Sequence, residues 1–492
     1  MARVSQPRAP SLIVALVPMV VLIALLAYNV LVYGDGGLGG PNQLALLLAA
    51  AVAFGIGALH GHRFNDLLDH VVRSIATALG AVLILLLIGA LAGTWMISGI
   101  VPAMIDHGLR LLSPRVFLVA ACLVCCVVSL ATGSSWSTTA TVGIALLGIG
   151  RAMGFHEGLV AGAVISGAYF GDKLSPLSDT TNLAPAVAGT DLFSHVRYMM
   201  NTTVPSISIA MLAFAGIGLF LVPHGSVDGV GPMLDAIEGR FHIGPWLYIP
   251  PLAVILMIWR KVPALPALLV GTLLGGLFAV FFQPQLLPVL VPQATGPFEG
   301  AYRLMIDAMT SSMAVITGDP IVDELLTSKG MGGMLPTIWL ILCAMTFGGA
   351  MEGAGLLQRI TGAVLRWARG TGSLVATTVV SAIFVNVTAS DQYLSIVVPG
   401  RMFAPVYRQR GLDPKLLSRS LEDAGTVTSP LVPWNTCGAY QSSVLGVATL
   451  TYLPFCFFNL ISPCMSILQA ALGWRIARIP APTPGPADGT PA

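Results

Sequence analysis

The chain has 492 residues, of which 55% are hydrophobic and only 9% are charged. Soluble proteins carry roughly 25% charged residues, so this composition excludes a soluble fold of this size and indicates that lipid covers most of the surface. The net charge of 24 − 22 = +2 gives no sign of a nucleic-acid partner.

Long apolar runs follow one another along the chain, and a helix needs about 20 apolar residues to cross a bilayer. The first run is longer than the core of a signal peptide, which is about 7–15 residues, so we expect a retained helix. The pattern predicts an all-α polytopic membrane protein in the lipid bilayer, with roughly 11–13 transmembrane segments. The runs lie at 11–33, 42–59, 75–101, 116–130, 204–222, 246–259, 262–282, 334–351, 374–387 and 445–474.

Polar interruptions rich in proline divide the chain into five parts, two of which look like copies of each other. In each copy a Ser/Thr break in an apolar run is followed 44 or 45 residues later by a proline with polar neighbours. Repeats of this kind are usual in secondary transporters, and an odd number of crossings in each would make them inverted. We predict N-terminal helices at 1–69, a first repeat at 70–222, a linker with central helices and a polar loop at 223–333, a second repeat at 334–478 and a disordered tail at 479–492.

The first break lies between the apolar runs that end at residue 130 and begin at residue 140. Gly133 allows the backbone to leave helical geometry. The hydroxyls of Thr132, Ser134 and Ser135 can then satisfy freed backbone groups or bind an ion. Single Ser and Thr residues often bond back to helix carbonyls. The density of hydroxyls here favours a functional site, because a broken helix in hydrocarbon persists only where it packs in protein or lines a cavity.

The second break brings Asp172, Lys173, Pro176 and Asp179 together within eight residues. It follows two Gly-x-x-x-Gly pairs, at 158–162 and 167–171, which predict close helix contact. A charge at mid-membrane costs about 2.5–3.5 kcal/mol, so such residues normally face a pathway, although an exposed loop is the alternative. Oxygen ligands suit a hard cation such as Na⁺. The candidate ion- or substrate-binding residues are Asp172, Lys173, Ser175, Asp179, Thr180, Thr181 and Asn182.

The second copy repeats both breaks with different residues. Glu422 and Asp423 precede its second break, and they fit a charged pair at a helix end beside Arg419 as well as they fit a functional pair. The candidate site residues are Asn386, Thr388 and Asp391 at the first break, and Thr428, Ser429, Asn435 and Thr436 at the second. Cys122, Cys125 and Cys126 lie inside an apolar run with no nearby His or acid, so we regard them as small core residues rather than metal ligands.

Competition at a carboxylate is the mechanism that these residues suggest. Ionised Asp172, Asp179 or Asp391 would ligate Na⁺, and protonation would release it, with no cofactor beyond the transported Na⁺ and H⁺. The alternative is a Na⁺- or H⁺-coupled organic-acid exchanger, in which Lys173 pairs with a substrate carboxylate and Asn435 and Thr436 hydrogen-bond it. An intramembrane enzyme is disfavoured, because the Gly-x-Gly-Asp pattern of membrane aspartyl proteases is absent at Asp172.

Several long motifs resemble the NhaC family of sodium/proton antiporters. They read GAYFGDKLSPLSDTTNLAP at 167–185, AGTDLF at 188–193, DQYLS at 391–395, LSRSLEDAGT at 417–426 and SPLVPWNTCGA at 429–439. The resemblance implies the ion transporter superfamily, with inverted repeats, broken helices, re-entrant hairpins and elevator-like alternating access in a homodimer. Its members exchange Na⁺ for H⁺, or malate for lactate with coupled ions. We expect the inner membrane of a bacterial cell, and Arg3 and Arg8 favour a cytoplasmic N-terminus.

Overall fold

The computed structural model describes residues 10–33, 40–111, 113–176, 178–220, 230–260, 262–318, 320–364 and 368–479. Within these residues the chain is almost entirely helical, and the strands are a single antiparallel pair, β1 Met313–Ala314 and β2 Thr327–Ser328. The predicted all-α class is therefore confirmed. Arg3, Arg8 and, apart from Ile479, the predicted disordered tail lie outside the described residues.

The helices before residue 230 include the N-terminal pair and the first repeat, and α3 runs through the predicted boundary at residue 70. They are α1 Leu12–Tyr33, α2 Pro41–Leu59, α3 Phe64–Ile97, α4 Ile100–Leu111, α5 Pro114–Thr132, α6 Ser135–Thr138, the π-helical η2 Thr139–Gly143, α7 Ile144–Ala152, α8 Glu157–Leu174, α9 Asp179–Ala188 and α10 Leu192–Phe220.

The remaining helices form the central region and the second repeat. The central region contains α11 Val230–Glu238, η3 Pro245–Tyr248, α12 Ile249–Trp259, α13 Ala264–Phe282, η4 Pro284–Leu286, α14 Leu287–Leu290, α15 Pro297–Thr310, α16 Pro320–Leu325 and η5 Met331–Met334. The second repeat contains α17 Leu335–Gly353, α18 Leu356–Val364, α19 Thr371–Thr388, α20 Gln392–Gln409, α21 Pro414–Leu421, η7 Glu422–Thr426, η8 Ser429–Leu431, α22 Thr436–Leu445, α23 Thr449–Tyr452, η9 Leu453–Phe455 and α24 Phe457–Ala471.

Eight helices of the described residues are long and apolar enough to cross a membrane, or nine if the bent pair at 449–471 is one span. This is fewer than the predicted 11–13. The difference arises because several apolar runs form broken or short helices, such as α12 with its 11 residues. The long helices are α1, α2, α3, α5, α10, α13, α17 together with η5, and α19.

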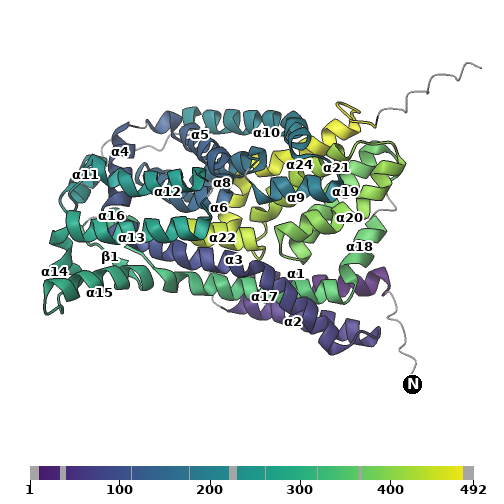
Figure 1. Ribbon diagram of the computed structural model, residues 1–492, viewed down its shortest axis with the longest axis horizontal. Coiled ribbons are helices and arrows are strands. Elements are labelled where there is room, and N and C mark those ends of the chain that lie inside the picture. Colours follow the sequence, from purple (N-terminus) through teal and green to yellow (C-terminus); the bar gives the residue numbers. More distant parts are fainter. Residues whose placement is uncertain are drawn as a thin grey trace, which may run out of the picture.

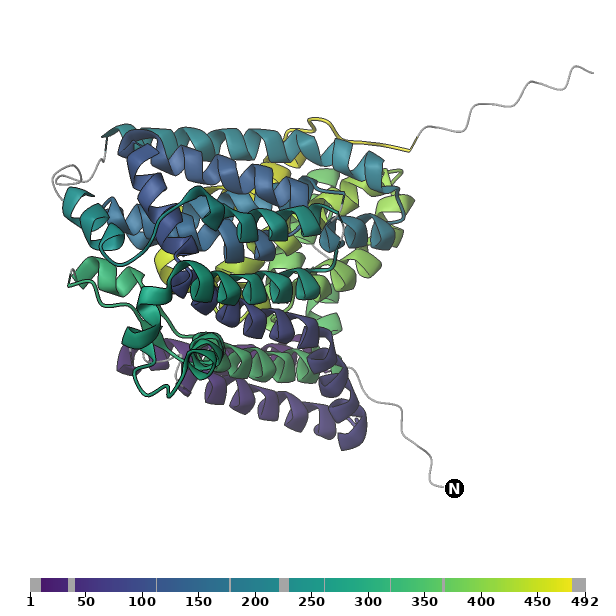
Figure 2. The same cartoon turned by 60° about the vertical axis from the view of Figure 1, so that its left-hand side comes forward.

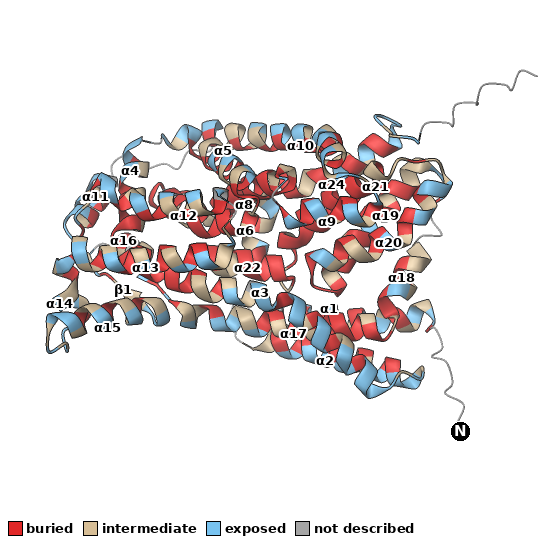
Figure 3. Cartoon of the chain, in the orientation of Figure 1, coloured by how far each residue is buried: buried red, intermediate tan, exposed pale blue. Residues whose placement is uncertain are grey.

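Most of the long helices run side by side along the long axis of the molecule (Figure 1). Helices α1, α2 and α17 lie at one side with α3, whereas α5, α10 and α24 lie at the other, and the turned view preserves this separation (Figure 2). The broken helices α6, α8, α9 and α22 lie between these two groups. The centre of the molecule is mainly buried, whereas the outer helices expose much of one face (Figure 3). Large apolar side chains cover parts of that exposed face, including Leu212 on α10 and Phe281 on α13. This surface suits a lipid environment.

The predicted glycine face on α8 is confirmed. A Cβ atom on Gly167 would lie 2.2 Å from the carbonyl oxygen of Cys122, and one on Gly171 would lie 2.5 Å from that of Cys126, so α5 and α8 touch backbone to backbone. Gly158 and Gly162 bring the other end of α8 equally close to Thr451 and Phe455. These contacts hold the second break of the first repeat at a fixed place.

We expect Gly167→Ala to lower stability by about 1–3 kcal/mol, because the added methyl overpacks the contact between α5 and α8. The measurement is thermal unfolding of the detergent-solubilised protein. Gly216→Ala on α10 is a matched control, because no atom of the described residues lies within 4 Å of its added Cβ. Equal unfolding temperatures for the two variants would contradict the close contact.

The two repeats share their turning points. Gly133 and Ser390 both have a positive φ, of 71° and 59°, and each is followed by a residue whose side chain caps the next helix, Ser134 or Asp391. Helices α9 and α22 both have 10 residues, begin after the caps Ser178 and Asn435 and end at a left-handed glycine. The structural offset is therefore 257 residues at both breaks.

Candidate ion-binding site

Asp172 lies in the last turn of α8 and reaches the first break of the same repeat. Its Oδ2 accepts hydrogen bonds from the backbone N–H of Ser135, at 3.1 Å, and from the Ser135 hydroxyl, at 2.6 Å. Its Oδ1 is buried and has no hydrogen-bond partner among the described residues. One half of this carboxylate is therefore fixed and the other half is available to a ligand.

Local sequence explains why Ser135 presents both groups to Asp172. Gly133 takes a left-handed conformation that ends α5, and the Ser134 side chain caps α6 by accepting a hydrogen bond from the Ser137 N–H. The N–H of Ser135 is then free of intrahelical bonding, as the first N–H groups of a helix always are. Both predicted breaks of the first repeat thus meet at one carboxylate.

Lys173 follows Asp172 in the chain, but its side chain contacts the second repeat instead of Ser135. Its ammonium forms an ion pair with Asp423 of the second repeat and a 3.1 Å hydrogen bond to the Ser462 hydroxyl of α24. Asp423 Oδ1 also accepts from Thr202 of α10 at 3.1 Å. Lys173 and Asp423 have no exposed surface, so this pair is a buried link between the repeats.

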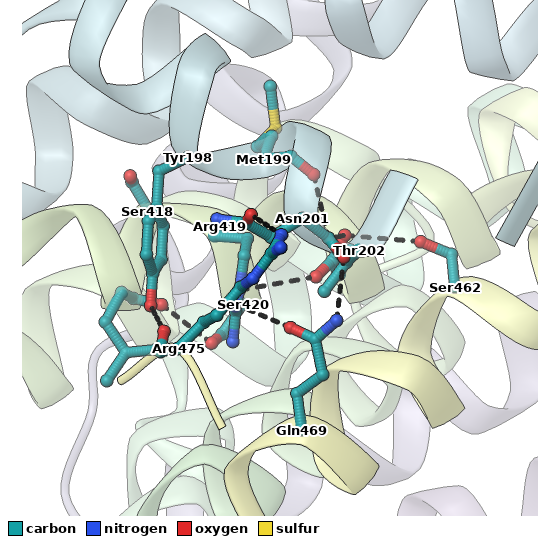
Figure 4. A network of polar contacts seen from close by, with 12 residues as sticks. Tyr198, Met199, Asn201, Thr202, Ser418, Arg419, Ser420, Ser462, Gln469 and Arg475 are labelled. Carbon is teal, nitrogen blue, oxygen red and sulfur yellow. Dashed lines mark hydrogen bonds and ion pairs between the residues drawn. The ribbon is translucent and has the colours of Figure 1, made fainter. Parts of the chain in front are cut away.

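Arg419 forms the other side of this charged cluster (Figure 4). Its guanidinium lies 4.8 Å from the ring centre of Tyr198 and donates to Gln469 Oε1 at 3.1 Å, and its Nε is 3.8 Å from Asp423 Oδ2. Gln469 in turn donates to the Asn201 carbonyl at 2.7 Å. Although Arg419 is completely buried, its Nε and Nη2 make no hydrogen bond to the described residues.

Glu422 is a second buried carboxylate with one free oxygen. The hydroxyl of Thr180 donates to Oε1 at 3.0 Å, whereas Oε2 has no hydrogen-bond partner among the described residues. Thr180 belongs to the second break of the first repeat and Glu422 to a π-helical turn of the second. Single π-helical turns inside α-helices are frequent at functional sites.

The two breaks of the second repeat also meet. The Asn386 side chain donates to the Gly425 carbonyl at 2.6 Å and to the Thr428 hydroxyl at 3.1 Å. Asn435 caps α22 and donates to the carbonyl and side-chain oxygens of Asn386, both at 3.1 Å. Asp391 caps α20 through the Leu394 N–H at 2.8 Å and is 3% exposed.

Aromatic residues join each repeat to the other. Trp136 of α6 stacks on Tyr440 of α22 with ring centres 3.9 Å apart, and the Tyr440 hydroxyl donates to the Trp136 carbonyl at 2.8 Å. At the corresponding place in the second repeat, Tyr393 of α20 donates to the carboxylate of Asp179 of α9. Asp179 is itself exposed, unlike Asp172.

The remaining predicted residues mainly support the backbone of the breaks. Thr181 donates to the carbonyls of Asp172 and Lys173, and the exposed Asn182 donates to those of Pro176 and Ser178. Ser429 donates to the Thr426 carbonyl and to Gln392, and the Thr436 N–H donates to the Ser390 carbonyl. Their roles as ligands stay predictions. Three others are buried: Thr132 lies near Thr138, Ser175 ends α8, and Thr388 donates to the Phe384 carbonyl.

Sequence reasoning missed the partners that complete the charged cluster. Glu422 and Asp423 fit two interpretations equally well from sequence, and Thr202, Ser462 and Gln469 are not among the predicted residues. The available signal was their polarity within otherwise apolar helices, since all three are fully buried. No group of three or more His, Cys, Asp or Glu side chains able to hold a metal ion occurs in the described parts of the chain.

Long apolar helices around buried carboxylates at helix breaks define a multi-pass integral membrane protein. A family model described as the Na+/H+ antiporter family matches residues 167–474. The chain is 38% identical over 438 residues to the Na(+)/H(+) antiporter NhaC of Alkalihalophilus pseudofirmus, covering 89% of this chain and 91% of that one. The chain belongs to the Na⁺/H⁺ antiporter family.

Relatives with other transported substrates are similar over almost the whole length. The chain is 34% identical over 468 residues to the Malate-2H(+)/Na(+)-lactate antiporter of Bacillus subtilis, covering 95% of this chain and 96% of that one. It is 33% identical over 474 residues to the Arginine/ornithine antiporter ArcD of Halobacterium salinarum, covering 95% and 93%. Both relatives are named as antiporters.

Proposed function

We propose that this protein is a Na⁺/H⁺ antiporter that works by alternating access, with Na⁺ and H⁺ competing at Asp172. The observation that carries the proposal is the divided carboxylate, with Oδ2 held by Ser135 and Oδ1 buried without a partner. The similarity to antiporters named NhaC supports the choice of ions.

Burial supplies the reason for exchange. An isolated charge in a low-dielectric interior is very costly, so a buried carboxylate needs either a cation or a proton. When Asp172 is ionised, Oδ1 serves as a ligand for Na⁺, and hydroxyl and carbonyl oxygens of the break complete the coordination. When Oδ1 is protonated, the charge that held Na⁺ is lost and the ion leaves. Ser135 holds the side chain in place in both states.

The test is transport by purified protein in liposomes. An imposed pH gradient is expected to drive ²²Na⁺ uptake against its own gradient, and a Na⁺ gradient is expected to move protons in the opposite direction. Protein-free liposomes give the background rate at which Na⁺ leaks across the membrane. Uptake of labelled malate, lactate or arginine without any Na⁺ flux driven by the pH gradient would overturn the Na⁺/H⁺ assignment.

A coupled organic-acid exchanger is the second candidate function, and Arg419 favours it. The buried guanidinium has unused N–H groups at Nε and Nη2, which are suited to a carboxylate. Lys173 was the predicted partner of a substrate carboxylate, but it is already paired with Asp423. The malate–lactate relative supports this candidate. It requires labelled malate or lactate exchange that Arg419→Gln abolishes.

The cellular setting belongs to the same proposal. We place the protein in the bacterial inner membrane as a homodimer with a cytoplasmic N-terminus, and its two repeats have inverted topology. The shared turning points of the repeats, 257 residues apart, support the duplication. Cysteine labelling from each side of the membrane at introduced loop sites tests the orientation.

A further inference from the structure

Buried oxygens from both repeats gather around Glu422. Thr180 donates to Glu422 Oε1 at 3.0 Å, and the Ser178 hydroxyl lies 3.2 Å from that of Thr180. Thr426 follows Glu422 by one helical turn, and its hydroxyl has no hydrogen-bond partner among the described residues. Glu422, Ser178, Thr180 and Thr426 are all fully buried. The set contains a carboxylate and three hydroxyls, which is the oxygen chemistry that hard cations prefer.

The charges around Glu422 leave it uncompensated. The buried charged groups that act on Glu422 or lie beside it are Asp172 and Lys173 of α8, Arg419 of α21 and Asp423. The other charged groups on the elements packed against it are the exposed Asp179 of α9, the exposed Arg401 and Arg408 of α20, and Lys415 of α21, which pairs with Asp413. Lys173 and Arg419 both direct nitrogen atoms at Asp423, not at Glu422. The neighbouring carboxylates thus have different environments: Asp423 is paired with cations, whereas Glu422 has no ion-pair partner among the described residues.

The sum of the buried charges also indicates that more than one cation binds here. At the breaks and on the helices beside them, Lys173 and Arg419 are fully buried cations, whereas Asp172, Asp391, Glu422 and Asp423 are buried carboxylates. If all six are ionised, 2 − 4 leaves two negative charges that no buried cationic side chain of these described elements compensates. Two monovalent cations, rather than one, would neutralise this interior.

We propose that Glu422 is the carboxylate of a second Na⁺ site, with the hydroxyl oxygens of Thr180 and Thr426 as further ligands. The site lies between the repeats, since Thr180 comes from the first and Glu422 and Thr426 come from the second. A proton on Glu422 Oε2 competes with this Na⁺ as it does at Asp172. The inference rests on the proposed Na⁺/H⁺ exchange and adds a second exchanging carboxylate to it.

The test counts Na⁺ ions bound by the full-length purified protein. Equilibrium binding of ²²Na⁺ at alkaline pH is expected to saturate at two ions per chain, and Glu422→Gln is expected to reduce this to one. Thr180→Val and Thr426→Val keep the carboxylate but remove a ligand, so each is expected to lower the affinity for one of the two Na⁺ ions about tenfold or more. Glu422→Asp is expected to restore partial binding at the weakened site.

Matched controls separate this inference from the proposed function. Glu157→Gln makes the same substitution at the N-terminal end of α8, away from the breaks, and is expected to leave two Na⁺ ions bound. Asp172→Asn reports on the first site independently. If Glu422→Gln binds as many ions as the wild type with unchanged affinity, the second site does not exist, whatever Asp172→Asn shows. If Glu422→Gln does not fold, unchanged binding by both threonine variants overturns the inference instead.

Discussion

Asp172→Asn is expected to abolish Na⁺ uptake driven by a pH gradient. The amide keeps the shape of the side chain, but it has no negative charge for Na⁺ and no proton to exchange. A charge-assisted contact is worth about 1.5–3 kcal/mol, so the apparent Na⁺ affinity is expected to fall about 10- to 100-fold even where residual binding remains. ²²Na⁺ uptake into liposomes over a range of Na⁺ concentrations measures both effects.

Asp179→Asn is the control for this prediction. Asp179 is an exposed acid on the same break, and the hydroxyl of Tyr393 already contacts its carboxylate. Since Asp179 is exposed and already accepts a hydrogen bond, losing its charge is expected to alter uptake much less than the loss of Asp172. Normal exchange by both variants would remove Asp172 from the site and leave Asp391 or Glu422 as the coupling carboxylate.

Breaking the ion pair between Lys173 and Asp423 is expected to have the largest effect on stability. Removing one member of a buried pair leaves an uncompensated charge and typically costs about 3–5 kcal/mol. We expect Asp423→Asn to lower stability more than Lys173→Met. In Lys173→Met, Asp423 keeps Arg419 as a partner, whereas Asp423→Asn removes the ion-pair partner of both Lys173 and Arg419. Thermal unfolding in detergent measures the difference.

The double variant Lys173→Met, Asp423→Leu, measured with each substitution alone, forms a double-mutant cycle. Asp423→Leu alone leaves two buried cations, Lys173 and Arg419, without their shared partner, whereas the double variant leaves only Arg419, so the double variant is expected to unfold at a higher temperature than Asp423→Leu. Transport provides a second readout, since a purely structural pair would allow the stable double variant to exchange Na⁺ normally. Additive destabilisation by the two substitutions would show that Lys173 and Asp423 do not interact.

The breaks in the helices were predictable because their signals are local. Gly133 ends α5, Pro176 follows the end of α8, and polar residues interrupt apolar runs at both places. Among the described residues, fewer helices are long and apolar enough to cross than the predicted 11–13, for a related reason. An apolar run shows that a segment is buried in lipid or protein, but it does not show whether the helix continues far enough to cross, as α12 illustrates.

The partners across the repeats were not predictable from spacing. Lys173 and Asp423 are 250 residues apart, and nothing in either local sequence selects one acid over another. Arg419 and Asp423 are four residues apart, which also fits an ordinary ion pair on a solvated helix. Burial distinguishes these two readings, and burial depends on the packing of α10 and α24 against α21 and η7.

The aromatic contacts between the repeats have a consequence for movement. Trp136 on Tyr440, and Tyr393 on Asp179, each join the first break of one repeat to the short helix after the second break of the other. Sliding one repeat past the other would separate both contacts at once. A displacement that carries α6, α9, α20 and α22 together would preserve them. The ion-binding carboxylates would then move together with these helices as one rigid body, and the surrounding helices would stay in place.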